Sequence, residues 1–341
     1  MYGQLPSTLD FTDIILEAVA GLVLFLYGVT RLSDSLKRLA GDRMKNILAK
    51  STVNPLAGVL TGTVACTILD SSSVTIIMVI ALVNAGALPF DRSLGVIMGA
   101  NIGTTISSQI FALKLNEYSP VLLAIGFLVY VLAKKRRTRY VGLNLFGIGL
   151  VLFGLETIGK AAEPLKDYRP FLDWMTGLET PLAGVGVGAI FTVLIQSSSA
   201  TLGIIIILAS KGLVPLTAGI GIMLGAEIGT CADTLVATLG RSRAAVRAGI
   251  FHLLFNLATV ALGVLFAAQL AGLAKWLAGG GGNVSRQIAN AHVLFNVAGV
   301  VLFVGFTPLI ARGLTRLIPD REKSPASEPK AKSPSPETQN D

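Results

Sequence analysis

Residues 55–113 read PLAGVLTGTVACTILDSSSVTIIMVIALVNAGALPFDRSLGVIMGANIGTTISSQIFAL, and residues 181–239 read PLAGVGVGAIFTVLIQSSSATLGIIIILASKGLVPLTAGIGIMLGAEIGTCADTLVATL. The two stretches align at a constant offset of 126 without a gap, with 21 identities in 59 positions. Upstream, the pentapeptide GLVLF occurs at 21–25 and again at 149–153. A gapless match of this length indicates an internal duplication rather than shared composition. We therefore predict two copies of one structural unit.

The composition places both copies in a membrane. Of the 341 residues, 52% are hydrophobic and 14% are charged, and the mean hydropathy is +0.69. Soluble domains carry about 25% charged residues. Long apolar runs recur along the whole chain, so we expect an all-α polytopic membrane protein. The net charge of +8 is concentrated between the apolar runs, which favours a role in membrane orientation over nucleic-acid binding. Cys66 and Cys231 lie inside apolar segments and do not suggest a disulfide framework.

The basic residues divide the chain into regions with a predicted orientation. Because cytoplasmic loops are rich in Lys and Arg, the basic stretch at 37–50, the cluster at 134–139 and the arginines at 241–247 are placed inside. The loop at 160–180 is placed outside, with the N-terminus outside and the C-terminus in the cytoplasm. The predicted regions are an extracytoplasmic segment at 1–13, transmembrane repeat one at 14–133, a basic cytoplasmic loop at 134–140, transmembrane repeat two at 141–273, an outer loop and last transmembrane helix at 274–313, and a disordered cytoplasmic tail at 314–341. The predicted apolar segments are 14–32, 56–69, 71–88, 94–113, 120–133, 141–158, 182–195, 197–209, 216–239, 250–273 and 288–310.

These markers predict that the two repeats have inverted topology. The first GLVLF segment runs from outside to inside, and the second runs from inside to outside because the cluster at 134–139 precedes it. Spanning takes about 20 helical residues, so the segments at 56–69 and 182–195 are too short to cross comfortably. Broken helices or re-entrant hairpins are therefore expected. Inverted repeats are typical of secondary transporters, whose binding site lies near the midplane between the repeats.

The duplicated serines predict an ion-binding site. Three consecutive hydroxyls are costly against lipid, and a broken helix resolves that cost. The free N–H groups and positive dipole end of the following helix would bind a small oxyanion. Hydroxyls and unwound carbonyls can also coordinate Na⁺. The alternative is that Ser and Thr only pack helices together, which is less suited to serines duplicated at matched positions.

Carboxylates at membrane depth are the other candidates. Asp70 and Glu227 each lie inside a duplicated motif, and Asp233, at the position matching Ser107, ranks third. In GANIGTT and GAEIGTC, oxygen ligands come from Asn101, Thr104, Thr105, Glu227 and Thr230. His252 and His292 occur in HLLFN and HVLFN, where His and Asn share one helix face, and a helix–helix hydrogen bond is expected for each. A serine hydrolase is not supported, because no GxSxG nucleophile motif surrounds the serines.

The chain resembles the type II sodium/phosphate cotransporter family and its bacterial branch over about residues 14–313. The motifs that carry this resemblance are QSSSAT at 196–201, its copy DSSSVT at 70–75, and GANIGTT with GAEIGTC. The resemblance implies sodium-coupled phosphate symport by alternating access in the plasma membrane of a prokaryote, with sodium as coupling ion and no other cofactor. It sets no oligomeric state. Taken with the motif residues above, the expected substrate and ion site comprises Gln196, Ser197, Ser198, Ser199, Thr201, Asp70, Ser71, Ser72, Ser73, Thr75, Asn101, Thr104, Thr105, Glu227 and Thr230. Sodium is expected at Ser72, Ser73, Asn101, Ser198, Ser199 and Glu227.

Two departures from the family pattern leave the substrate open. The family has Gln where this chain has Asp70, and commonly Asn where it has Glu227. Two carboxylates repel phosphate unless cations or protons neutralise them. They would serve as additional Na⁺ ligands or proton-coupling groups, or they would mark transport of another oxyanion or of a cation. A non-transporting membrane scaffold or channel is the alternative outside the transporter class.

Overall fold

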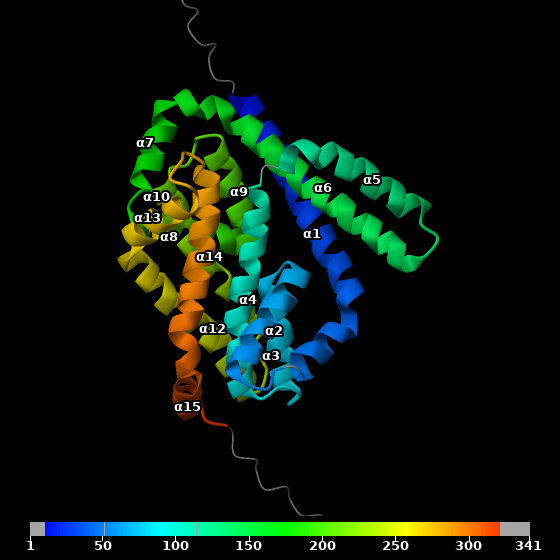
Figure 1. Cartoon of the computed structure of the whole chain (residues 1–341), viewed down its shortest axis with the longest axis vertical. Helices are drawn as coiled ribbons and strands as arrows, with labels where there is room; N and C mark the ends of the chain where they lie inside the picture. Colours follow the sequence, from blue (N-terminus) through cyan, green and yellow to red (C-terminus); the bar gives the residue numbers. More distant parts are fainter. Residues whose placement is uncertain (1–10, 51, 114, 321–341) are drawn as a thin grey trace, which may run out of the picture.

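The computed structural model describes residues 11–50, 52–113 and 115–320, and within these ranges the chain forms helices and turns without a β-strand. The predicted all-α fold is thus confirmed (Figure 1). The helices of the first part are α1 (Phe11–Lys50), α2 (Pro55–Leu69), α3 (Ser72–Asn84), α4 (Phe90–Phe111), η1 (Leu115–Tyr118), α5 (Ser119–Leu132) and α6 (Arg136–Ala162). Those of the second part are η2 (Glu163–Asp167), α7 (Arg169–Gly177), α8 (Pro181–Ile195), α9 (Ser198–Ser210), α10 (Leu216–Gly229), α11 (Cys231–Val236), α12 (Arg243–Leu265), α13 (Ala267–Leu277), α14 (Val284–Phe303), η3 (Val304–Phe306) and α15 (Thr307–Leu317).

The duplication in the sequence is matched by a duplication in local structure. Helices α2 and α3 end and begin at the same positions as α8 and α9 when the offset of 126 is applied. The residues between the paired helices, Asp70 and Gln196, both adopt the left-handed conformation, with φ of 50° and 58°. A side chain is strained in that region, yet both copies use it at the same position. The helix break before each serine run is therefore a shared feature of the two copies.

Glycines hold each of the two hairpins, α2–α3 and α8–α9, against the long helix that follows it. A Cβ on Gly99 of α4 would lie 2.0 Å from the carbonyl oxygen of Val59 in α2. At the matched position, a Cβ on Gly225 of α10 would lie 2.1 Å from the carbonyl oxygen of Val185 in α8. Such distances exclude any side chain, so the backbones approach as closely as small residues permit in membrane helix pairs. The glycines of GANIGT and GAEIGT thus serve close helix approach.

The two GLVLF segments pack against one another. In α1, Gly21 lies against the carbonyl oxygen of Gly154 in α6, and a Cβ on Gly154 would lie 2.5 Å from the Phe25 nitrogen. The buried side chain of Phe25 joins Val151 and Leu155 of α6 and Ile204 of α9 in one apolar cluster. A second cluster groups α2–α4 with α12 and α15, and a third groups α9 and α10 with α13 and α14. Each copy therefore has its own apolar core, and α1 with α6 lies against the second hairpin.

Within the described residues, six helical segments are long and apolar enough to cross a membrane: Phe11–Leu39, Leu115–Leu132, Arg136–Asp167, Leu216–Val236, Arg243–Leu265 and Val284–Leu317. Helices α2, α3 and α9 are apolar but shorter. At 1.5 Å per residue, the 13 residues of α3 extend about 20 Å, less than the roughly 30 Å of hydrocarbon in a bilayer. Helices α7 and α8 form one apolar pair bent by 103°. Broken helices are thus part of the fold, as predicted.

The two hairpins occupy opposite halves of the molecule. In Figure 1, α2 and α3 lie in the lower half and α8 and α9 in the upper half. The start of α1 and the end of α15 also lie at opposite ends of the long axis (Figure 1). This arrangement is compatible with inverted repeats and with termini on opposite sides, both of which stay predictions.

Several predicted loops are helical. The basic stretch at 37–50 continues α1 to Lys50, and α6 begins at Arg136, inside the predicted loop at 134–140. The predicted outer loop at 160–180 contains η2 and α7. Helix α15 extends to Leu317, so the first residues of the predicted disordered tail are helical, whereas 1–10 and 321–341 lie outside the described residues. Lys and Arg favour helices as strongly as Leu does, so these charges end the apolar segment without ending the helix.

Two predicted spans contain breaks. The segment at 216–239 is divided at Thr230 into α10 and α11, where the Thr234 N–H donates to the Asp233 carboxylate at 2.7 Å, an alternative to the helix ladder. The segment at 250–273 is divided at Phe266 into α12 and α13. The 23 residues of α12 already extend about 35 Å, enough to cross a bilayer. The last predicted span, 288–310, consists of α14, η3 and the start of α15.

Candidate functional site

Serines begin the second helix of each hairpin. The Ser71 hydroxyl caps α3 by accepting from the Val74 N–H at 3.2 Å, and the Ser197 hydroxyl caps α9 by accepting from the Ala200 N–H at 3.2 Å. Both caps are extended, with φ near −160°, directly after the left-handed residue. The capping bonds explain why serine occupies these positions.

The first two N–H groups of each of these helices are available to a ligand. In α3 they belong to Ser72 and Ser73, and in α9 to Ser198 and Ser199. Helix geometry gives such groups no partner in their own helix. Ser72, Ser198 and Ser199 are buried, and Ser73 is half-buried. Each hairpin thus presents a buried helix start with the positive end of its dipole and hydroxyls beside it, an arrangement suited to an anion.

A cavity of about 370 Å³ joins the first hairpin to the second. Its lining includes Asp70, Ser107 of α4, Ser199 of α9 and Asn144 of α6, among apolar side chains of α1, α4 and α6. The Ser107 hydroxyl donates to the Asp70 carboxylate, and the Ser35 hydroxyl donates to Asn144 Oδ1. The cavity therefore brings one carboxylate of the first copy near one serine of the second.

The matched contact occurs on the other side of the pair. Asp233, which stands where the first copy has Ser107, lies beside Ser73 of α3. Hence Ser73 of the first copy lies beside Asp233 of the second, and Ser199 of the second copy lines a cavity with the matched Ser107 of the first. The acid lies in the hairpin of the first copy, at Asp70, and in the long helix of the second, at Asp233.

A buried chain of hydrogen bonds links the two long helices through α12. Asn101 Nδ2 donates to Asn256 Oδ1 at 2.6 Å, and Asn256 Nδ2 donates to the Glu227 carbonyl oxygen at 2.7 Å. His252 Nδ1 lies 2.8 Å from Thr234 Oγ1. The Thr234 hydroxyl donates to the Cys231 carbonyl oxygen at 2.9 Å, so it accepts from His252, which is neutral with its proton on Nδ1.

A second chain passes through α14. Glu227 Oε1 accepts from His292 Nε2 at 2.8 Å and from Asn296 Nδ2 at 3.1 Å. His292 Nδ1 lies 2.8 Å from the Ser108 hydroxyl. With its proton on Nε2, His292 donates to the carboxylate and accepts from Ser108, so it is satisfied in the neutral form. The helix–helix hydrogen bonds predicted for His252 and His292 are confirmed.

The two His–Asn pairs bridge the copies in a reciprocal way. Asn101 and Glu227 are matched positions, as are Ser108 and Thr234. In α12, the histidine contacts the second copy, and the asparagine contacts Asn101 of the first and the Glu227 carbonyl oxygen of the second. In α14, the asparagine contacts the second copy, while the histidine contacts Ser108 of the first and Glu227 of the second. The polar interior thus has approximate two-fold order, broken by Glu227.

The remaining predicted residues have local roles. The hydroxyls of Thr75, Thr104, Thr105, Thr201 and Thr230 donate to carbonyl oxygens of their own helices or helix caps. Thr201 also meets Thr192 of α8 at 2.8 Å. Gln196 is exposed. Within residues 52–113 and 115–320, no hydrogen bond joins the predicted sodium ligands of the serine runs to Asn101 or Glu227. The structure therefore has two polar groups, one at the serine runs and one around Glu227.

Sequence reasoning missed the partners in these groups. Ser107, Ser108, Asn256 and Asn296 contact residues that the sequence singles out, but they are not themselves predicted site residues. Asn144, which lines the cavity beside Asp70, is not predicted either. The available signals were the offset of 126, which matches Ser108 to Thr234, and the repeated spacing of HLLFN and HVLFN.

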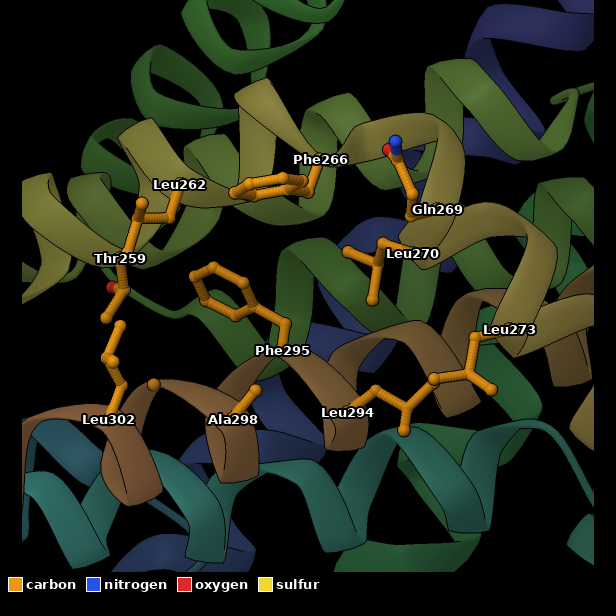
Figure 2. Close-up of a pocket in the computed structure, with 12 residues that line it drawn as sticks. Thr259, Leu262, Phe266, Gln269, Leu270, Leu273, Leu294, Phe295, Ala298 and Leu302 are labelled. Carbon is orange, nitrogen blue, oxygen red and sulfur yellow. The ribbon is translucent and has the colours of Figure 1, made fainter.

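Another cavity, of about 360 Å³, lies between α12, α13 and α14 (Figure 2). Side chains such as Phe266, Leu270 and Phe295 surround it, and its polar lining residues are Thr259 and Gln269. Because no ionisable side chain lines it, this cavity is unsuited to an oxyanion or a cation.

Comparison with known proteins identifies the family that this chain resembles in sequence. The family model described as Na⁺/Pi-cotransporter matches residues 24–160 and 166–306. The protein YqeW of Bacillus subtilis is 30% identical over 307 residues, which cover 90% of this chain and 99% of YqeW. YjbB of Salmonella typhimurium, provisionally named an inorganic phosphate export protein, is 24% identical over 307 residues.

The extent of these matches differs. The aligned region is 90% of this chain but 56% of YjbB, so the chain spans little more than half of that relative. Sodium-dependent phosphate transport protein 2A of Mus musculus is 32% identical over 99 residues, 28% of this chain and 15% of the mouse protein. No solved structure matches the chain.

Proposed function

This chain belongs to the Na⁺/Pi-cotransporter family, a family of transporters and not of enzymes, and from that premise we propose that it is a sodium-coupled symporter of inorganic phosphate that works by alternating access. The proposal depends chiefly on one observation, the pair of buried, serine-capped helix starts at α3 and α9. Phosphate would accept hydrogen bonds from the free N–H groups and hydroxyls there, and both helix dipoles would favour its charge.

Sodium has a separate set of oxygens in this proposal. Asp70 and Asp233 each lie beside a serine run, where an unneutralised carboxylate would repel phosphate. A hard cation between the carboxylate and the hydroxyls removes that repulsion. Sodium binding would therefore precede phosphate binding, which is the physical basis of coupling. The buried groups around Asn101 and Glu227 would hold α4 and α10 against α12 and α14 while the serine runs become accessible first from one side of the membrane and then from the other.

The arrangement in the membrane follows from the same premise. We propose that the two copies are inverted repeats, with the N-terminus outside and the C-terminus in the cytoplasm of a prokaryotic cell. The positions of α2–α3 and α8–α9 in opposite halves of the molecule support it. Each hairpin would then reach toward the midplane from its own side, as in transporters with discontinuous helices.

The test is uptake of labelled phosphate into proteoliposomes with and without an inward Na⁺ gradient. We expect saturable, Na⁺-dependent uptake, and a loss of at least about tenfold in Ser198→Ala, since a hydrogen bond to a charged ligand contributes roughly 1.5–3 kcal/mol. Gln196→Ala and Ser72→Ala should also lose uptake while expression is retained. Ser210→Ala is the matched control, because Ser210 lies at the far end of α9 and its hydroxyl bonds only to the Ile207 carbonyl.

Normal uptake by Ser198→Ala and Gln196→Ala would show that the serine runs are not the phosphate-binding site. Uptake that does not depend on Na⁺ but follows a proton gradient would show that protons, and not sodium, neutralise the carboxylates and drive transport. Competition by another oxyanion that exceeds competition by phosphate would change the substrate and keep the site.

Export is a second candidate for the direction of transport. It is favoured by the provisional name of YjbB as an export protein. Proteoliposomes loaded with phosphate decide the direction: efflux driven by an outward Na⁺ gradient, compared with uptake driven by an inward gradient, shows which direction the protein supports.

A further inference from the structure

A basic pocket of about 670 Å³ lies between the second half of α1 and the start of α6, away from the serine runs. Arg38 and Arg43 come from α1, and Arg136 and Arg137 come from the first turn of α6. The rest of the lining is Leu39, Tyr140 and Val141. The sequence predicts these arginines as orientation markers, which requires only that they lie on one side of the membrane. Convergence in one concave pocket is an additional property.

No carboxylate is among the side chains described at this pocket. Among the side chains described in residues 11–39, 43–50, 52–113 and 115–320, none of the four arginines is in an ion pair. A second basic surface pocket, around Arg312 and Arg316 of α15, differs in this respect. It contains Asp91, and its Arg247 is paired with Asp320. Of these two basic pockets, the one between α1 and α6 is the one whose described lining contains arginines without a carboxylate.

Tyr140 orders two of these arginines. Arg136 Nε donates to the Tyr140 hydroxyl at 3.2 Å, and Arg38 lies beside the same hydroxyl. Arg136 also lies over the Tyr140 ring, 5.8 Å from its centroid. The positive end of the α6 dipole points into the same region. A phosphate group suits this geometry, since guanidinium groups bind its oxygens in pairs.

Apolar side chains are exposed at the pocket and on the helix packed beside α6. Leu39 and Val141 form part of the pocket lining, and Val141 is 44% exposed. Helix α5, which packs against α6, exposes Leu128, Val131 and Leu132. A ligand that places an anion on the arginines and hydrocarbon on this surface would use both features. Free phosphate would use only the first.

We propose that this pocket binds the phosphate headgroup of an anionic phospholipid, whose acyl chains lie along the exposed apolar side chains of α5 and α6. Basic pockets between transmembrane helices are suited to such headgroups. The inference does not depend on what the protein transports, because none of these residues belongs to the serine runs or to the groups around Glu227.

The test uses the purified full-length chain in detergent, with lipid binding followed by native mass spectrometry and by thermal stabilisation. Phosphatidylglycerol is compared with phosphatidylcholine and with inorganic phosphate alone. We expect phosphatidylglycerol to bind and stabilise the wild type in preference to the other two. Arg38→Gln with Arg136→Gln should weaken phosphatidylglycerol binding about 30-fold, and either change alone about fivefold. Arg312→Gln with Arg316→Gln is the matched control and should leave binding unchanged.

Three results would overturn the proposal. Equal binding of phosphatidylcholine would show that charge is not recognised. Wild-type affinity in either single variant, each of which changes one exposed side chain, would exclude this pocket as the site. Inorganic phosphate that matches phosphatidylglycerol in affinity and displaces it would make the pocket a site for the free anion.

Discussion

The two copies of the repeat have nearly the same backbone but different charges. Both have a left-handed residue, a serine cap and glycines that press the hairpin against the following long helix. They differ in charge at three matched positions within the duplicated polar segments: Asp70 against Gln196, Asn101 against Glu227, and Ser107 against Asp233. The first copy thus contributes one acid and the second contributes two.

This difference separates what the scaffold requires from what the chemistry requires. Positions that fix the backbone cannot change in either copy without moving a helix. Positions that carry charge differ, and each acid has a polar neighbour: Asp70 bonds to Ser107, Glu227 bonds to His292, and Asp233 lies beside Ser73. A two-fold scaffold can therefore hold an asymmetric set of ions. Four changes test this comparison.

The largest effect is expected where the copies are alike. Gly99→Ala and Gly225→Ala each place a Cβ about 2 Å from a backbone oxygen of the facing helix. Because the backbone must move, both should lower the free energy of unfolding by about 3 kcal/mol. Thermal unfolding of the purified protein measures this. Gly186→Ala is the control, since nothing lies within 4 Å of a Cβ there. A Gly225→Ala variant as stable as Gly186→Ala would contradict the close approach.

The next effect tests the asymmetry around Glu227. Glu227→Ala leaves His292 Nε2 and Asn296 Nδ2 without their acceptor, so we expect a loss of about 2 kcal/mol in the free energy of unfolding. Glu227→Gln keeps an acceptor oxygen and should lose less than half of that. Thermal unfolding again measures both. If the two variants were equally destabilised, the negative charge rather than the hydrogen-bond geometry would be what α14 requires.

A smaller effect is expected from making the first hairpin more like the second. Asp70→Asn removes the carboxylate that the second copy replaces by Gln196, and should shift the Na⁺ half-saturation of transport by roughly threefold or more, or change its pH profile. Uptake in proteoliposomes at varied Na⁺ concentration and pH measures this. Asp91→Asn, at the start of α4 and remote from the serine runs, serves as control. An unchanged Na⁺ and pH profile would show that the charge of Asp70 is not part of coupling.

The smallest effect concerns the far ends of α3 and α9. Lys211 caps α9 and lies 3.2 Å from Glu156 of α6, whereas the matched residue in the first copy is Ala85. Lys211→Ala should therefore cost roughly 0.5 kcal/mol of unfolding free energy, as a partly exposed ion pair does. Lys160→Ala is the control, because Lys160 meets the same carboxylate at 3.8 Å and is 67% exposed. A greater loss of unfolding free energy in Lys160→Ala would show that Lys160, and not Lys211, is the more important partner of Glu156.

Helix boundaries within the copies could be predicted because short-range chemistry decides them. The serine runs and the prolines at 55 and 181 mark the starts of α2, α3, α8 and α9. The sequence did not predict the breaks at Thr230 and Phe266 or the continuation of α1 through its basic stretch. Apolarity alone does not say where a helix stops once it has left the hydrocarbon. The candidate site divides in the same way. Asp70, the serines, Asn101 and Glu227 are visible as duplicated polar residues in apolar segments, but their partners on α12 and α14 are not.

By itself the sequence determined the membrane class, the duplication and the position of the helix break before each serine run, because these follow from composition, repetition and local capping. Only the tertiary structure decided that Ser73 meets Asp233 across the copies and that α12 and α14 each contact both copies with one His–Asn pair. The reason is physical: which side chains meet between helices depends on rotation and close approach of whole helices, set by glycines such as Gly99 and Gly225. The interhelical pairing therefore became visible only when the helices were packed.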